Sequence, residues 1–167
     1  MQLKHSETSF QKIKFPITVV CDKLRTPENI GMMFRVCESF GVQKIILSAE
    51  SPNPKDKTVK RISRNTNELI AYETSTNLFN SVTELKQKGC KIIAVEITQT
   101  AIPIQKLNLQ KKEELVLIIG TERNGIEEEL LHLANETVYI PMYGENSSMN
   151  VVNALSVVLY ELTNKMK

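Results

Sequence analysis

The chain contains no tryptophan, only two histidines, and no long apolar run in its 167 residues. A membrane-spanning helix needs about 20 consecutive, mainly apolar residues, so we expect no membrane span. The amino-terminal residues include Lys4, Lys12 and Lys14 but no apolar segment of the kind found in secretory signals. We therefore expect a cytoplasmic protein.

Metal-ligand patterns are also missing. The three cysteines, Cys21, Cys37 and Cys90, are far apart, and none belongs to a CxxC pair. Each lies in or beside an apolar pattern, so we expect three buried thiols and no bound metal. His5 falls in a polar segment and His132 in an acidic one. Neither completes a Ser–His–Asp set for nucleophilic catalysis.

The formal net charge of +2 is too small to indicate a nucleic-acid partner by itself. Its distribution is more informative, because residues 51–67 carry five cations and a single acid, Asp56. This polar segment also contains two prolines and is locally basic in a nearly neutral chain. Its cations are Lys55, Lys57, Lys60, Arg61 and Arg64.

Five short apolar runs rich in β-branched residues predict buried strands. Segments with helical periodicity follow four of these strands. This alternation predicts an α/β fold with a mostly parallel sheet flanked by helices. Its length fits a single domain, placed at residues 16–167 after a short basic arm at 1–15. The strands are expected at 17–21, 44–47, 91–95, 115–119 and 137–140, and the helices near 27–40, 78–88, 127–133 and 149–163.

In sheets of this kind, ligands bind beyond the carboxyl ends of the strands, and three polar loops are expected there. The first contains Asn29, Gly31 and Arg35; its alternative interpretation is a polar first turn of a helix with a surface arginine. The second, residues 120–125, has a glycine at each end, which lets a ligand approach the backbone closely. A plain strand-to-helix turn is the alternative, although Glu122 is placed to orient an arginine or a ligand hydroxyl.

The third loop lies within residues 140–156, between a strand and a helix expected to begin at Ser147 or Ser148. Four polar residues fall between these two apolar elements: Asn146, Ser147, Ser148 and Asn150. Buried polar groups need partners, and capping of the helix satisfies only one or two of them. The loop is therefore a candidate site.

Together, the three loops resemble the signature motifs of the SpoU branch of the SPOUT RNA methyltransferases. Residues 29–41 resemble the first motif, 117–126 the second, and 140–144 with 148–151 the third. The motifs have the family's order and spacing. The resemblance implies a C-terminal trefoil knot, which is rare enough to rest on the family alone. It also implies S-adenosylmethionine as cofactor, a homodimer, and methyl transfer to a ribose 2′-OH of RNA.

The resemblance also implies roles for individual residues. The cofactor contacts come from the backbone around Gly120, Ile140 and Met149, beside the strand end at Val95 and Glu96. Arg35 lies nearest the reacting hydroxyl; because arginine stays protonated, it binds phosphate and the developing alkoxide. The residues that fix Arg35 and the ribose are Asn29, Glu122, Ser148 and Asn150.

Two positions depart from the family pattern. Ser148, Met149 and Asn150 stand where Ser-Leu-Asn is usual, and residues 64–68 replace a segment rich in small residues. The basic segment, from Lys55 to Arg64, and the lysines of the arm are the candidates for RNA phosphate contacts; a solvated charged loop is the alternative. The small single domain favours tRNA over rRNA as substrate.

Two other functions remain open from the sequence. A non-catalytic RNA-binding protein would keep the fold without the reaction. A nucleotide-binding α/β domain of another kind is disfavoured, because neither a GxGxxG pattern nor a GxxxxGK[ST] phosphate loop is present.

Overall fold

The computed structural model describes residues 11–121, 123–145 and 148–167. Within them, seven strands form one sheet in the order β3-β2-β1-β6-β4-β7-β5, and every neighbouring pair is parallel. The predicted α/β fold with a parallel sheet is confirmed. The strands are β1 (Phe15–Cys21), β2 (Val42–Ser48), β3 (Ala71–Ser75), β4 (Lys91–Val95), β5 (Ile102–Pro103), β6 (Leu115–Ile119) and β7 (Glu136–Tyr139).

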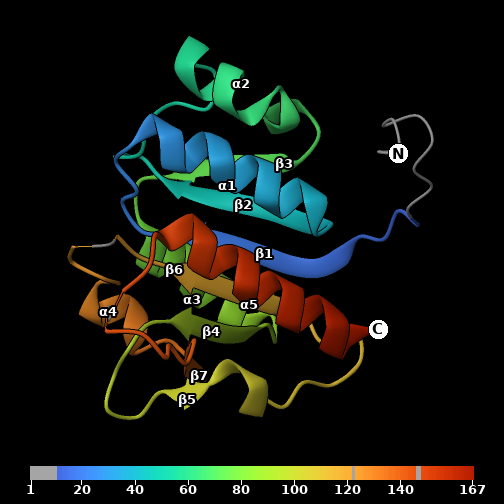
Figure 1. Ribbon diagram of the computed structural model, residues 1–167, viewed down its shortest axis with the longest axis vertical. Helices are drawn as coiled ribbons and strands as arrows, with labels where there is room; N and C mark the ends of the chain where they lie inside the picture. The colour runs from blue at the N-terminus through green and yellow to red at the C-terminus, as the bar shows by residue number, and fades with distance from the viewer. Residues whose placement is uncertain (1–10, 122, 146–147) are drawn as a thin grey trace.

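Helices cover both faces of the sheet (Figure 1). One face packs against α1 (Pro27–Ser39) and α5 (Val151–Met166), and the other against α3 (Leu78–Gln87) and the short α4 (Glu128–Leu131). Successive side chains of β1 point to opposite faces of the sheet: Val19 belongs to the apolar cluster on the first face and Val20 to the cluster on the second. This two-sided burial explains why the central strands are continuous apolar runs.

The start of α1 agrees with the predicted capping pattern. Thr26 is the N-cap, and its Oγ1 accepts a hydrogen bond from the backbone N–H of Asn29 at 3.4 Å. Pro27 occupies the first turn, where its missing N–H costs nothing. After the helix, Gly41 has φ +63°, the left-handed conformation expected of a C-terminal glycine. This helix presents Asn29 and Arg35 from a fixed position beside β1.

No helix was expected in the polar segment at residues 51–67. This segment contains α2 (Lys57–Ser63) and a 3₁₀ turn, η2 (Thr66–Glu68). The helix has only seven residues, too few to show a clear apolar period. It packs closely against α1, since a Cβ on Gly31 would lie 2.7 Å from the Cβ of Ile62. The basic residues are therefore mounted on a helix rather than on a loop.

The expected strands are present with boundaries shifted by up to two residues, but β3 and β5 were missed. β3 has the sequence AYETS at one edge of the sheet and is largely exposed, so it lacks an apolar run. β5 has two residues at the other edge. β1 begins at Phe15, the last residue assigned to the arm. The trefoil knot and the division at residues 15 and 16 stay predictions.

In the part of the chain that the structure describes, no helix is long and apolar enough to cross a membrane. The three cysteines are buried and unpaired, as expected. Burial raises the pKa of the Cys21 and Cys37 thiols, so neither is a ready nucleophile.

Candidate functional site

A pocket lies at the carboxyl ends of β4, β6 and β7. It holds about 680 Å³ of empty space, open solvent included. Its walls come from the ends of these strands, from the segment before α5, and from the first turn of α5. The five residues predicted to bind the cofactor all line it: Val95, Glu96, Gly120, Ile140 and Met149. The structure thus brings together residues that are up to 54 positions apart in the sequence (95 to 149). Their role in binding stays a prediction.

The glycine-bounded loop after β6 folds back on itself beside this pocket. Thr121 and Gly125 exchange backbone hydrogen bonds of 3.0 and 2.9 Å, and the N–H of Asn124 donates to Thr121 Oγ1 at 3.1 Å. The turn is so tight that a Cβ on Gly120 would lie 2.2 Å from the backbone of Gly125. Glu122, a predicted catalytic residue, lies outside the described residues.

Two carboxylates hold the end of this loop from opposite sides. Glu96, after β4, accepts a hydrogen bond from the backbone N–H of Ile126 at 3.2 Å. Asp22, after β1, accepts one from the N–H of Glu127 at 2.8 Å. Lys23 adds an ion pair with the Glu127 side chain. The loop is therefore tied to strands on both sides of β6 and offers a fixed wall to the pocket.

Asp22 was missed by the sequence analysis, although an acid directly after a buried strand is a usable signal. Its side chain is 2% exposed, and Oδ1 has no hydrogen-bond partner in the described structure. Burial raises the pKa of Asp22 above its ordinary value of 3.8, and the hydrogen bond from Glu127 offsets part of this rise. Keeping Asp22 ionised in the folded chain therefore lowers the free energy of unfolding.

We expect this effect to appear in the pH dependence of unfolding. Because the pKa is higher in the folded state, the folded chain binds more protons than the unfolded chain between 3.8 and the raised pKa of Asp22. Its contribution to stability is therefore present at low pH and is lost as the pH rises through this window. Asp22→Asn should remove that slope in urea titrations run at a series of pH values. Equal slopes for the two proteins would contradict the assignment.

The polar stretch before α5 has one well-defined member, Asn150. The helix begins at Val151 with Asn150 as N-cap, so the expected start at Ser147 or Ser148 is wrong. Asn150 Oδ1 accepts from the N–H of Val152 at 2.9 Å, while its Nδ2 donates to Asn29 Oδ1 at 3.1 Å. One side chain therefore joins the first turns of α5 and α1. Asn146 and Ser147 lie outside the described residues.

The other predicted catalytic residues are only partly gathered. Ser148 is exposed and lines the pocket. Arg35 is half-buried on α1, nearly two turns beyond Asn29, and its Nη1 lies 3.9 Å from the Sδ of Met32 on the same helix. The structure thus pairs Asn29 with Asn150 and places Ser148 at the pocket, whereas it leaves Arg35 at the side of α1.

Two substitutions separate the roles of Asn150. Asn150→Ala removes the N-cap and should lower the free energy of unfolding by about 1 kcal/mol. Asn150→Asp keeps an oxygen for capping and adds a favourable charge at the helix start, but loses the donor to Asn29. We expect near-native thermal stability and strongly reduced activity for Asn150→Asp. Equal losses of stability in both variants would show that the contact with Asn29, not capping, stabilises this junction.

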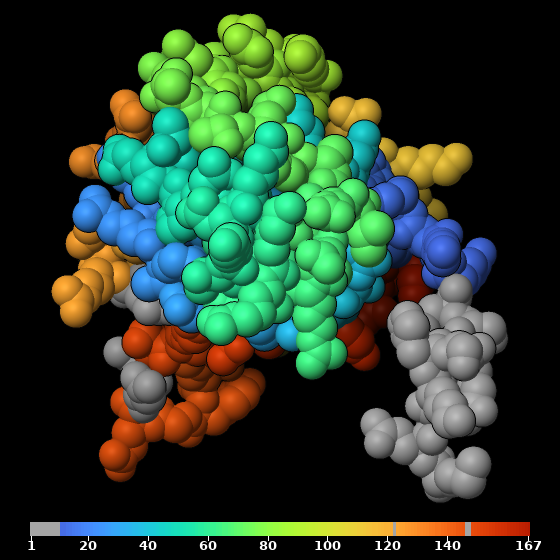
Figure 2. Space-filling model, turned by 90° about the horizontal axis from the view of Figure 1, so that it is seen from above, coloured from blue at the N-terminus to red at the C-terminus, as the bar shows by residue number. Residues whose placement is uncertain are grey.

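The five predicted RNA-binding residues lie around α2. Lys55 precedes the helix, Lys57, Lys60 and Arg61 lie on it, and Arg64 is its left-handed C-cap. Lys60 Nζ pairs with Glu68 Oε1 at 3.3 Å, while Lys55, Lys57, Arg61 and Arg64 are exposed. Figure 2 shows the teal and green residues of this region spread over one end of the molecule. We call these five residues the basic surface.

The described residues contain no group of three or more His, Cys, Asp and Glu side chains that could hold a metal ion.

Comparison with known proteins gives relatives that act on RNA. The chain is 26% identical over 145 residues to the tRNA (guanosine(18)-2′-O)-methyltransferase of Escherichia coli (strain K12), covering 87% of this chain and 62% of that protein. It is 27% identical over 144 residues to the 23S rRNA (guanosine(2553)-2′-O)-methyltransferase RlmP of Bacillus subtilis (strain 168), covering 86% and 56%. The chain thus spans about three fifths of the length of these relatives.

Solved structures agree with the fold. The TrmH/SpoU tRNA modifying enzyme of A. aeolicus superposes with a TM-score of 0.82 at 25% identity, covering 92% of this chain and 77% of that one. The methyltransferase AviRb of Streptomyces viridochromogenes, in complex with AdoMet, gives a TM-score of 0.79 at 20% identity, with coverage of 97% and 64%. The model of the SpoU rRNA Methylase family matches residues 16–160, so the chain belongs to this family.

Proposed function

We propose that the chain transfers a methyl group from S-adenosylmethionine to a ribose 2′-hydroxyl of RNA, with tRNA preferred over rRNA. The observation that carries this proposal is the convergence of the five predicted cofactor residues on one pocket at the carboxyl ends of the sheet. Family membership and relatives named as tRNA and rRNA 2′-O-methyltransferases support it. An RNA substrate of this kind would place the protein in the cytoplasm.

The pocket has the chemistry that S-adenosylmethionine needs. Ile119, Ile140 and Val151 offer apolar surface for the adenine, and the missing side chain at Gly120 allows close approach to the backbone. The carboxylate of Glu96 lines the same pocket and suits ribose hydroxyls or a cationic group. When bound, the cofactor supplies an electrophilic methyl group on a sulfonium. The residues present therefore fit this cofactor.

The catalytic work of the chain is positioning and charge stabilisation. Asn29 and Asn150 are joined by a hydrogen bond between their side chains, and this contact would position the first turns of α1 and α5 for the ribose. Arg35, as a fixed cation with several donors, would bind an RNA phosphate and the oxygen that becomes negative as its proton leaves. In free protein its guanidinium contacts Met32, so the long side chain would turn toward RNA on binding.

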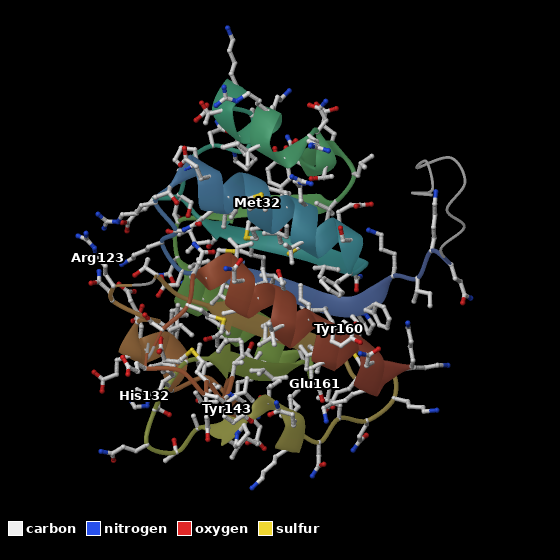
Figure 3. All side chains as sticks on the ribbon, in the orientation of Figure 1. Met32, Arg123, His132, Tyr143, Tyr160 and Glu161 are labelled. Carbon is white, nitrogen blue, oxygen red and sulfur yellow. The ribbon has the colours of Figure 1, made fainter. Side chains whose placement is uncertain are left out.

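A second copy of the chain is proposed to cover the face formed by α1 and α5. Met32, Val157 and Tyr160 are 41%, 43% and 61% exposed on these two adjacent helices. Figure 3 shows Met32 and Tyr160 on the same face of the molecule. Apolar side chains gathered on one face are typical of protein interfaces. Sedimentation equilibrium tests this directly, and a monomer at all micromolar concentrations would contradict it.

The basic surface on α2 is expected to contact RNA phosphates. Replacing Lys57, Arg61 and Arg64 by alanine should weaken RNA binding and reduce the slope of log affinity against log salt by about 0.7 to 0.9 per lost phosphate contact. The matched control removes three exposed lysines from other segments of the chain, Lys88, Lys106 and Lys111. An equal change of slope in both triple variants would show that only the overall charge matters.

Two measurements test the activity itself. Isothermal titration with S-adenosylmethionine should show binding, and transfer of a labelled methyl group should occur to total tRNA more than to rRNA. A non-catalytic RNA-binding protein would bind RNA without binding the cofactor. Absence of cofactor binding would overturn the proposal, and greater labelling of rRNA would overturn the preference for tRNA.

A further inference from the structure

A second pocket lies beside the basic surface, between α2, η2 and the start of β3. It holds about 690 Å³ of empty space, open solvent included. Its lining residues are Lys55, Lys60, Asn67, Glu68, Ile70, Ala71 and Tyr72. The two pockets share no described lining residue. In the sheet, β3 is separated from the strands that end at the first pocket by β2 and β1. The second pocket is therefore a distinct site.

The walls of this pocket are held in place by buried contacts. Asn67 is 4% exposed; its Nδ2 donates to the carbonyl of Pro54 at 3.1 Å, and its Oδ1 accepts from Ser63 Oγ at 2.8 Å. The Tyr72 ring packs edge-to-face against Phe34 on α1, with ring centroids 5.3 Å apart and an interplanar angle of 81°. Such pairs hold aromatic rings in a fixed orientation. These contacts fix Asn67 and Tyr72, while the side chains of Lys55 and Glu68 are exposed.

Its lining combines two kinds of chemistry. Tyr72 and Ile70 provide aromatic and aliphatic surface, while Lys55 and Lys60 provide two ammonium groups. Glu68 pairs with Lys60 at 3.3 Å and so holds that ammonium at the pocket. Lys55, Lys60 and Glu68 together carry a net charge of +1. A ligand that matches has a flat ring and an anionic group close together. A nucleotide has both.

We propose that this pocket binds one unpaired nucleotide of the RNA substrate, with its phosphate at Lys55 and Lys60 and its base against Tyr72 and Ile70. The proposal rests on the RNA substrate proposed above, and it gives the basic surface a more specific role. Phosphate contacts alone carry no information about base pairing. A base that must enter a pocket has to leave its duplex, so this site would select loops and single-stranded segments.

A variant that removes the aromatic surface of the pocket without changing charge provides the test. Tyr72→Leu replaces the ring by an aliphatic side chain that can still pack against Phe34. Tyr72→Phe is the matched control, because it keeps the ring in the pocket lining and loses only the hydroxyl. Thermal melts of both variants would check that the fold is retained.

Binding would be measured to a short single-stranded RNA of mixed sequence and to the duplex of the same sequence. We expect Tyr72→Leu to lower affinity for the single strand about tenfold, the scale of one lost base stack. Its affinity for the duplex should stay within about twofold, and Tyr72→Phe should bind both as wild type does. No loss for Tyr72→Leu, or an equal loss for both RNAs, would overturn the proposal.

The same experiment separates this inference from the proposed activity. If the wild type neither binds S-adenosylmethionine nor transfers a methyl group, but Tyr72→Leu selectively loses single-stranded RNA, the pocket stands and the activity fails. If methylation occurs and the variant shows no selective loss, the activity stands and the pocket fails.

Discussion

Arg35→Ala is expected to reduce methyl transfer by about a thousandfold or more, while the affinity for S-adenosylmethionine changes little. Loss of one donor to a developing oxyanion costs about 10²–10³ in rate, and this side chain is also proposed to bind a phosphate. Arg35 is not among the residues that line the cofactor pocket. The effect should therefore fall on the reaction and on RNA, and single-turnover methylation with parallel calorimetry would measure it.

Two further variants sharpen this prediction. Arg35→Lys keeps the charge but not the planar set of donors, so we expect it to recover RNA binding more than rate. Arg25→Ala is the control, because Arg25 is exposed just before α1 and its recorded ion pair is with Glu50 at 3.8 Å. Methylation by Arg35→Ala within about tenfold of wild type would remove Arg35 from the catalytic role.

Stability is not expected to explain the loss. The Arg35 side chain is half-buried, and its recorded contact is a long one, 3.9 Å to the Met32 sulfur. Substitutions at positions of this kind usually change the free energy of unfolding by less than about 1 kcal/mol. A chemical denaturation curve close to that of the wild type would confirm that the site, rather than the fold, is affected.

The parts of the fold that the sequence predicted are those set by local pattern. β1, β4 and β6 are buried on both faces and therefore read as apolar runs, and α1 carries its cap and its C-terminal glycine in the chain itself. The edge strand β3 could not be found this way. Its residues need little apolar character, because it has only one strand neighbour and its side chains are largely exposed.

The candidate site, like the fold, could be predicted only in part from local pattern. Family motifs predicted the residues that line the first pocket, and the structure brings them together. They did not predict how the pocket wall is supported, since Asp22 was missed and Glu96 was named only for the cofactor. Asp22 and Glu96, which follow two different strands, fix the adjacent backbone N–H groups of Glu127 and Ile126. Such contacts depend on how strands far apart in the chain are ordered in the sheet, which no local spacing records.

Gly120→Ala is expected to be the most damaging small substitution in the site. Its Cβ would lie 2.2 Å from the carbonyl carbon and oxygen of Gly125 and 2.5 Å from the nitrogen of Ile126. These are backbone atoms, so no side chain can rotate away. The hydrogen bonds from Ile126 and Glu127 to the two carboxylates also resist a shift of the loop. We expect a loss of about 3 kcal/mol in the free energy of unfolding, measured by urea denaturation, together with loss of cofactor binding.

The chain contains its own control for this prediction. A Cβ on Gly144 would meet no atom within 4 Å, and φ at Gly144 is not in the positive range. Gly144→Ala adds the same methyl group to another loop near the pocket, and we expect its stability and cofactor affinity to match those of the wild type. If Gly120→Ala also binds S-adenosylmethionine normally, the loop can open by the width of a methyl group without disturbing the pocket. The pocket wall would then not depend on the tight turn between Gly120 and Gly125, and the cofactor would have to be held mainly by the segments at Ile140 and Met149.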